Sequence, residues 1–264
     1  MVDYFESVGI DAIDMSFESL SRLEDSWESV LYSAAKRARQ KKIALPACHL
    51  SFYMPSPRDE ALMAKYSLEL KKGIDAAALM GISLAVVHPI AFYSANATYG
   101  DWVRANMKFL TPIVEYARGK NVKICIENMP SSSDREKEGN HLYGSCAINI
   151  SALAEKLSAG ICFDVGHANI SGYKISEQME ILKDKIDLLH IHDNDGVSDR
   201  HLLPFDCRVD WNDVAQGMKK SGFSGILDVE VTAWAMSGEK DVRNDFGAKI
   251  ISRARRLLDM AELL

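Results

Sequence analysis

The sequence predicts an α/β fold of the (β/α)8 TIM-barrel class, for three reasons. Short runs of β-branched and other apolar residues alternate with longer amphipathic runs from one end of the chain to the other. The short runs are apolar almost throughout, which is typical of parallel strands covered on both faces. No glycine-rich dinucleotide fingerprint follows any of them, which disfavours an open Rossmann sheet. A chain of 264 residues is also a normal length for one such barrel.

Seven strands and seven helices are expected, in strict alternation. The strands are residues 12–15, 43–49, 84–88, 122–128, 161–165, 188–192 and 226–231. The helices are residues 24–41, 59–80, 102–120, 150–157, 175–185, 211–221 and 241–263. Gly81, Gly160, Gly222 and Gly225 fall between a helix and the next strand, where the chain needs a C-cap or a tight turn.

The first β/α unit of the barrel is expected to be missing or shortened. The chain begins with what is predicted to be the end of a helix, residues 2–8, and a complete barrel needs a strand and most of a helix before it. Such a barrel leaves two strand edges unpaired. A misplaced gene start and closure by another element both stay open as explanations. Because no linker or change of composition divides the chain, residues 1–264 are expected to form a single domain.

Composition and charge are those of a protein that forms an ordinary apolar core. Apolar residues make up 47% and charged residues 26% of the chain. The net charge of −6 disfavours a nucleic-acid partner, because phosphate contacts need a basic surface. No apolar run approaches the ~18 residues of a membrane span, and the N-terminus does not have the pattern of a signal peptide. The five cysteines are dispersed, without a C-x-x-C pair. We therefore expect a cytoplasmic protein with reduced cysteines.

Residues 187–201 hold three of the seven histidines and four aspartates, directly after an apolar run. Such a cluster is either a solvated loop or part of a metal site, since His and Asp are common ligands of zinc and manganese. Within it, His190 ends a strand and is the expected ligand. His192 is expected to lie further from the metal and to contact its ligands at most. Asp193 and Asp195 are expected to shape the loop or face solvent.

The ends of the other strands carry the same kinds of side chain. These residues are His49, His88, Glu127, Asp164, His190 and Glu230, with His167, Asp199 and His201 just beyond. Each alone has an ordinary explanation, as a core histidine or a helix cap. In a parallel barrel, however, all strand C-termini open onto one face, so these groups converge. Glu127 and Glu230 end apolar runs, where an unpaired carboxylate is costly and a divalent cation removes the cost. The sequence therefore predicts a metal site.

Carboxylate and imidazole without thiolate suit zinc, manganese, cobalt or iron(II), and magnesium also stays open. Two glutamates beside a bound metal can act as an acid–base pair. One removes a proton from the carbon next to a carbonyl group and the other returns it, while the metal stabilises the enediolate.

Six short motifs resemble the sugar phosphate isomerase/epimerase family. They are residues 87–89 (Val-His-Pro), 126–129 (Ile-Glu-Asn-Met), 163–168 (Phe-Asp-Val-Gly-His-Ala), 190–193 (His-Ile-His-Asp), 199–201 (Asp-Arg-His) and 229–231 (Val-Glu-Val). The family belongs to the xylose-isomerase-like TIM barrels, with endonuclease IV, the ketose 3-epimerases and inosose dehydratase. The likeness runs from Gly9 to the end of the chain.

The resemblance implies a metal-dependent isomerase or epimerase of a small sugar or sugar-like carbonyl substrate. It implies that Glu127, Asp164, His190 and Glu230 bind one divalent metal ion, zinc or manganese first, with Glu127 and Glu230 as the catalytic pair. It places His167 against substrate oxygen. No phosphate cradle is visible, so a phosphorylated substrate is not indicated. The oligomeric state stays open, a homo-oligomer included.

Three alternatives remain. In the endonuclease IV pattern, five further residues hold additional zinc ions, up to three in all: His49, His88, His167, Asp199 and His201. An inosose-dehydratase-like enzyme would share the first proton abstraction. A metal-binding barrel without catalysis is the third alternative.

Overall fold

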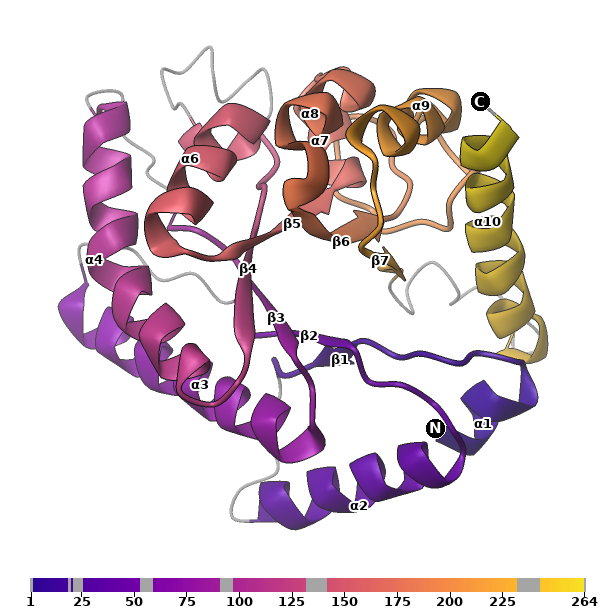
Figure 1. Cartoon of the computed structure of the whole chain (residues 1–264), viewed down its shortest axis with the longest axis horizontal. Coiled ribbons are helices and arrows are strands. Elements are labelled where there is room, and N and C mark those ends of the chain that lie inside the picture. Colours follow the sequence, from indigo (N-terminus) through magenta and orange to yellow (C-terminus); the bar gives the residue numbers. More distant parts are fainter. Residues whose placement is uncertain are drawn as a thin grey trace. The chain divides into compact units, whose positions relative to one another are not determined.

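The computed structural model describes residues 2–18, 20, 26–52, 59–90, 97–131, 142–231 and 243–263. Figure 1 shows the whole chain, which divides into two compact units. The first comprises Met1–Ala91, Thr98–Ile126 and Leu153–Gly160. The second comprises Phe92–Ala97, Glu127–Ala152 and Ile161–Leu264.

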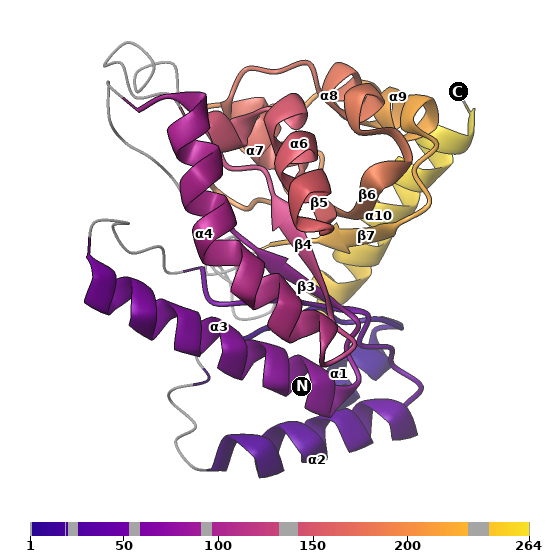
Figure 2. The ribbon, with the colours of Figure 1, turned by 60° about the vertical axis from the view of Figure 1, so that its left-hand side comes forward.

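The strands of the first unit pair in parallel and in chain order. They are β1 (Met15–Ser16), β2 (Ala47–His49), β3 (Leu84–Val87) and β4 (Lys123–Glu127), of which β4 reaches the second unit with its last residue. The helices are α1 (Val2–Ser7), α2 (Trp27–Gln40), α3 (Glu60–Met80) and α4 (Tyr99–Arg118). The helix α3 lies between α2 and α4, as Figures 1 and 2 both show. This is the β–α–β order expected of parallel strands.

Local sequence sets the ends of these helices. The Asp59 side chain accepts a hydrogen bond from the Leu62 N–H and caps α3, and Gly81 ends it with a left-handed φ of 78°. Thr98 and Asp101 form a capping box at the start of α4. The apolar face of α3 is buried, including Leu70 and Ile74, which are fully covered.

The described part of the second unit contains three parallel strands, also in chain order: β5 (Gly160–Asp164), whose first residue belongs to the first unit, β6 (Ile186–Ile191) and β7 (Ile226–Val229). Its helices are α7 (Val165–Ile170), α8 (Ile175–Leu182), α9 (Trp211–Ser221) and α10 (Arg243–Leu263), while α6 (Ala147–Leu157) has residues in both units. Two 3-10 turns, Tyr143–Ser145 and Lys183–Lys185, are also found among its described residues. The helices α8 and α9 lie side by side, and α10 packs beside α9 (Figure 2).

The predicted order of strands and helices is confirmed, with shifts at the boundaries. The strand expected from residue 43 begins at Ala47, because Pro46 has no N–H for the ladder, and only Ala44 before it forms a bridge, to Ala12. The short helix α7 was not predicted, because six residues are too few for a periodic pattern. The helix starts expected at residues 24 and 241 lie outside the described residues. In the described ranges, no helix is long and apolar enough to cross a membrane.

Candidate metal centre

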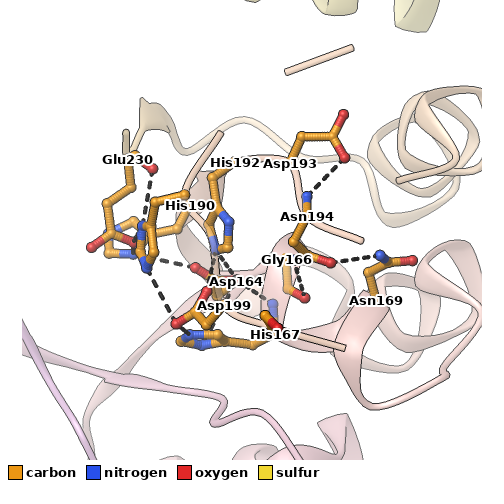
Figure 3. A network of polar contacts seen from close by, with 12 residues as sticks. Asp164, Gly166, His167, Asn169, His190, His192, Asp193, Asn194, Asp199 and Glu230 are labelled. Atoms are coloured by element: carbon orange, nitrogen blue, oxygen red, sulfur yellow. Dashed lines mark hydrogen bonds and ion pairs between the residues drawn. The ribbon is translucent and has the colours of Figure 1, made fainter. Parts of the chain in front are cut away.

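Four side chains converge at the carboxyl ends of β4 to β7 in the second unit. Glu127 is the last residue of β4, Asp164 the last of β5, His190 the fifth of β6, and Glu230 directly follows β7. Figure 3 labels Asp164, His190 and Glu230 of these four. One donor atom from each lies within 4.8 Å of the others. We call these four residues the strand-end cluster.

The Nδ1 atom of His190 faces all three carboxylates of the strand-end cluster. It lies 3.2 Å from Glu230 Oε2, 3.4 Å from Glu127 Oε1 and 3.9 Å from Asp164 Oδ2. Glu127, Asp164 and His190 are at most 1% exposed. Three carboxylates around one imidazole therefore concentrate negative charge in a largely buried site, at which only Glu230 is partly exposed.

The electrostatics of the strand-end cluster reflect this charge. Burial raises the pKa of Glu230, but the positive charge of His190 beside it outweighs burial and lowers the pKa to about 2. Burial lowers the pKa of His190, but the neighbouring Cys162 and Glu230 raise it well above its ordinary value. The cluster thus attracts positive charge, which a proton on His190 or a cation supplies.

A divalent cation fits this donor set. Among the described residues, Asp164 Oδ2 and Glu230 Oε2 are shielded from solvent and accept no hydrogen bond. Buried carboxylate oxygens without a partner are costly, and a cation satisfies both at once. Three oxygen donors and one imidazole nitrogen suit zinc, manganese or iron(II).

A second group of possible ligands lies beside the first and consists of His167, His192, Asp199 and His201, which we call the loop cluster. His167 Nδ1–H donates to the backbone oxygen of Asn128 at 2.8 Å, and His201 Nδ1–H to that of Glu230 at 3.1 Å. The Nε2 atoms of both rings lie 3.2 Å from Asp199 Oδ2. A ring held by one nitrogen, with the other left for a cation, is the usual arrangement of metal-binding histidines.

Charge also accumulates in the loop cluster. Burial lowers the pKa of His167, but Asp164, Asp199 and Glu127 raise it to about 10. The pKa of His201, lowered by burial, is raised to about 9 chiefly by Asp199 and Glu230. Burial raises the pKa of Asp199, and its hydrogen bonds to the two histidines bring it far below its ordinary value.

Local structure fixes both clusters. Asp164 caps α7 by accepting the His167 N–H at 2.6 Å, which places His167 one turn into the helix. The Asn128 side chain accepts the Asp164 N–H at 2.7 Å and donates to the Asp164 carbonyl at 2.9 Å. Asn128 therefore ties the end of β4 to the end of β5.

The loop that carries Asp199 and His201 is closed by an antiparallel bridge between Asp193 and Leu202. The Asp193 carboxylate accepts four hydrogen bonds, from the N–H groups of Asn194, Cys207 and Val209 and from Trp211 Nε1. Asp193 thus shapes the loop, as predicted, but it is fully buried and does not face solvent. Asp195 accepts the N–H groups of Val197 and Ser198 and is the more exposed of the two.

His192 and Asp228 each lie close to a residue of the strand-end cluster. For His192 the sequence predicted such a contact at most, and Asp228 was not predicted at all. His192 is fully buried and its Nε2 lies 3.2 Å from Asp164 Oδ1. Asp228 stands directly opposite His190 in the β6–β7 register, with its Oδ2 3.6 Å from His190 Nε2. The sequence could have indicated both residues, because side chains two residues apart on a strand point to the same face. His192 is two residues from the predicted ligand His190, and Asp228 is two residues from the predicted ligand Glu230.

His49 and His88 belong to the first unit, at the end of β2 and directly after β3. Their rings meet edge to face with centroids 4.9 Å apart, and His49 Nδ1 lies 2.7 Å from the Leu50 oxygen. Their role as further metal ligands stays a prediction.

The chain belongs to the xylose isomerase-like TIM barrel family, whose model matches residues 2–248. It thus has the TIM-barrel fold that the sequence predicted, and solved structures of the same fold agree. A D-tagatose 3-epimerase-like protein is 22% identical, with a TM-score of 0.74 over 96% of this chain and 90% of that chain. The IOLI protein, solved with a zinc atom, is 19% identical, with a TM-score of 0.70 over 98% of this chain and 91% of that chain.

Sequence relatives match smaller parts of the chain. An uncharacterized protein of Methanocaldococcus jannaschii, MJ1311, is 28% identical over 61% of this chain and 55% of its own length. A probable endonuclease 4 of Bacillus subtilis is 27% identical over 50% of this chain and 46% of its own length. The chain therefore spans about half the length of these curated relatives.

Proposed function

We propose that this chain is a cytoplasmic, divalent-metal-dependent isomerase or epimerase of a small sugar or related carbonyl compound. The observation that carries the proposal is the convergence of Glu127 and Glu230 on the same buried donor set as Asp164 and His190. The resemblance to a D-tagatose 3-epimerase-like structure and to IOLI is consistent with it. The free state of all five cysteines is consistent with the compartment.

In the proposed reaction, Glu127 and Glu230 carry protons. One carboxylate removes a proton from the carbon beside the substrate carbonyl, and the other, protonated beforehand, delivers a different proton. Delivery to the opposite face of the same carbon gives an epimer. Delivery to the neighbouring carbon, with transfer of the hydroxyl proton from one oxygen to the other, gives an isomer. When bound by Glu127, Asp164, His190 and Glu230, a divalent cation supplies Lewis-acid stabilisation of negative charge on substrate oxygens.

The direct test is solvent exchange. The protein with added manganese or zinc is incubated in heavy water with a panel of ketoses and polyol-derived ketones, and proton NMR follows the hydrogen beside the carbonyl. We expect deuterium at that carbon for at least one member of the panel, together with a new isomer. A dehydratase would instead show the loss of a hydroxyl group. The absence of any exchange across the panel contradicts the proposal.

A second candidate function is hydrolysis of abasic DNA, as in endonuclease IV. It is favoured by the loop cluster, in which His167, His201 and Asp199 are arranged for a further cation. The net charge of −6 opposes it, because binding a phosphate backbone needs a basic surface. Cleavage of an abasic duplex by protein with two or three bound metal ions, without sugar exchange, would favour this candidate.

A further inference from the structure

His192 is a fully buried histidine that the proposed reaction does not use. It lies two residues after His190, just beyond β6. Its Nε2 is 3.2 Å from Asp164 Oδ1 and 3.6 Å from Asp199 Oδ1. Its other nitrogen, Nδ1, is shielded from solvent and has no hydrogen bond among the described residues. His192 therefore contacts a residue of the strand-end cluster and a residue of the loop cluster.

Ring geometry indicates that His192 does not share a cation with His201. The two imidazoles are stacked, with centroids 4.1 Å apart and planes inclined by only 11°. An imidazole binds a metal in its own plane, at ~2.0–2.1 Å from the nitrogen. A cation in the plane of His201 lies far outside the plane of His192. The stacking therefore excludes the binding of one cation by both rings. His201 already points Nε2 at Asp199, which leaves His192 for another task.

The hydrogen bonds of Asp164 identify that task. Asp164 Oδ1 accepts the His167 N–H at 2.6 Å and faces His192 Nε2. A carboxylate accepts, so Nε2 carries the hydrogen and His192 donates. With Oδ1 held by two donors, Oδ2 is directed to the strand-end cluster, where it lies 3.9 Å from His190 Nδ1 (Figure 3).

The imidazole of His192 packs against the backbone of Gly166, where the absence of a side chain leaves room for the ring. A Cβ on Gly166 would lie 2.0 Å from His192 Cε1 and 2.3 Å from its Nε2, so any side chain there displaces the imidazole. The Asn194 side chain donates to the Gly166 carbonyl at 2.9 Å and holds that backbone in place. Gly166, Asn194 and the stack on His201 together fix the ring in the orientation that reaches Asp164.

We propose that His192 is a positioning residue that holds Asp164 through its Oδ1 atom, so that Oδ2 faces the cation of the strand-end cluster. The inference rests on the proposed metal site and deepens it. It predicts that His192 controls affinity for the metal ion at that site without itself being a ligand.

The test compares two variants with the wild type. His192→Leu keeps the volume but removes the donor, and His192→Gln places an amide N–H near the position of Nε2. Affinity for the first equivalent of Zn²⁺ is measured by competition with a chelating dye, and the visible spectrum of the Co²⁺-loaded protein reports ligand geometry. We expect His192→Leu to bind about 10–100-fold more weakly and to shift the Co²⁺ bands. His192→Gln should restore most of both properties, and the control Asp195→Asn should change neither.

Several outcomes would overturn the inference. If His192→Leu binds the first equivalent as tightly as the wild type, Asp164 does not depend on this residue. If it loses only a second equivalent, His192 is a ligand of the loop cluster. If His192→Gln stays as weak as His192→Leu while both metal-free variants melt at lower temperature, the role is merely structural. A wild type that binds no cation overturns the proposed function as well, whereas the other outcomes leave that function standing.

Discussion

Glu127 and Glu230 differ from the other residues of the strand-end cluster because the proposed reaction needs them both as ligands and as proton carriers. Replacing Glu230 with Gln keeps its size and removes its ability to take a proton. We expect Glu230→Gln, and equally Glu127→Gln, to reduce solvent exchange by about 10²–10⁴-fold, which is the usual effect of general acid–base catalysis.

The measurement is the NMR exchange assay, with circular dichroism to show that the variants fold. Asp195→Asn is the matched control, because Asp195 is a carboxylate of the neighbouring loop that belongs to neither cluster. Exchange at the wild-type rate in Glu230→Gln would remove Glu230 from the catalytic pair.

Asp228 is expected to tune the ligand His190. Its Oδ2 lies at an ion-pair distance of 3.6 Å from His190 Nε2, on the side of the ring opposite to the three carboxylates around Nδ1. A carboxylate in that place orients the ring and raises its basicity. Asp228→Asn should therefore lower affinity for Zn²⁺ by about 10–100-fold and leave the thermal stability of the metal-free protein nearly unchanged. Unchanged affinity for Zn²⁺ would show that the pair has no influence on the ligand.

At the scale of elements, the loop from Asp193 to Leu202 is the part of the site that depends most on one residue. The Asp193 carboxylate accepts four hydrogen bonds from this loop and from the segment that leads into α9. Removing a buried acceptor leaves its donors without partners. Asp193→Ala should therefore reduce the free energy of unfolding by about 2–4 kcal/mol, as measured by urea denaturation.

The same variant should weaken metal binding at the loop cluster more than at the strand-end cluster. Asp199 and His201 lie on the loop that Asp193 holds, whereas the strand-end ligands lie on or next to β4 to β7. Titration of Asp193→Ala with Co²⁺ separates the two effects. An equal loss at both clusters would mean that the loop is not an independent element.

The elements also show how much of the site could be predicted from the sequence. Strand ends were predictable, because apolar β runs stop at polar residues and parallel strands present those ends at one edge. The convergence of Glu127, Asp164, His190 and Glu230 follows from this rule. The helix α7 was not predictable, because Asp164 caps it directly at the end of β5 without an intervening loop.

The roles of His192 and Asp228 could not be predicted for a different reason. Parity places them on the same face as a ligand, but only distances show which ring nitrogen each contacts. Likewise, the burial of Asp193 depends on donors from Cys207, Val209 and Trp211, which the sequence alone does not bring together.

At the scale of the whole molecule, metal binding and stability are linked, because a cation that binds only the folded chain stabilises it. The strand-end cluster brings three carboxylates together around one imidazole, and the mutual repulsion of the carboxylates destabilises the metal-free protein. The cation offsets this repulsion, so the whole chain should respond to its binding.

Thermal unfolding with and without Mn²⁺ or Zn²⁺ is the measurement that tests the metal centre most directly. At about 100 times the dissociation constant, a single bound ion contributes ~2.7 kcal/mol, which raises Tm by roughly 5–10 °C for a chain of this size. We predict such a rise in the wild type, with at least one ion per chain by metal analysis, and its loss in Asp164→Asn combined with Glu230→Gln. A wild type whose Tm does not change with any of these ions, and which carries none, would contradict the account.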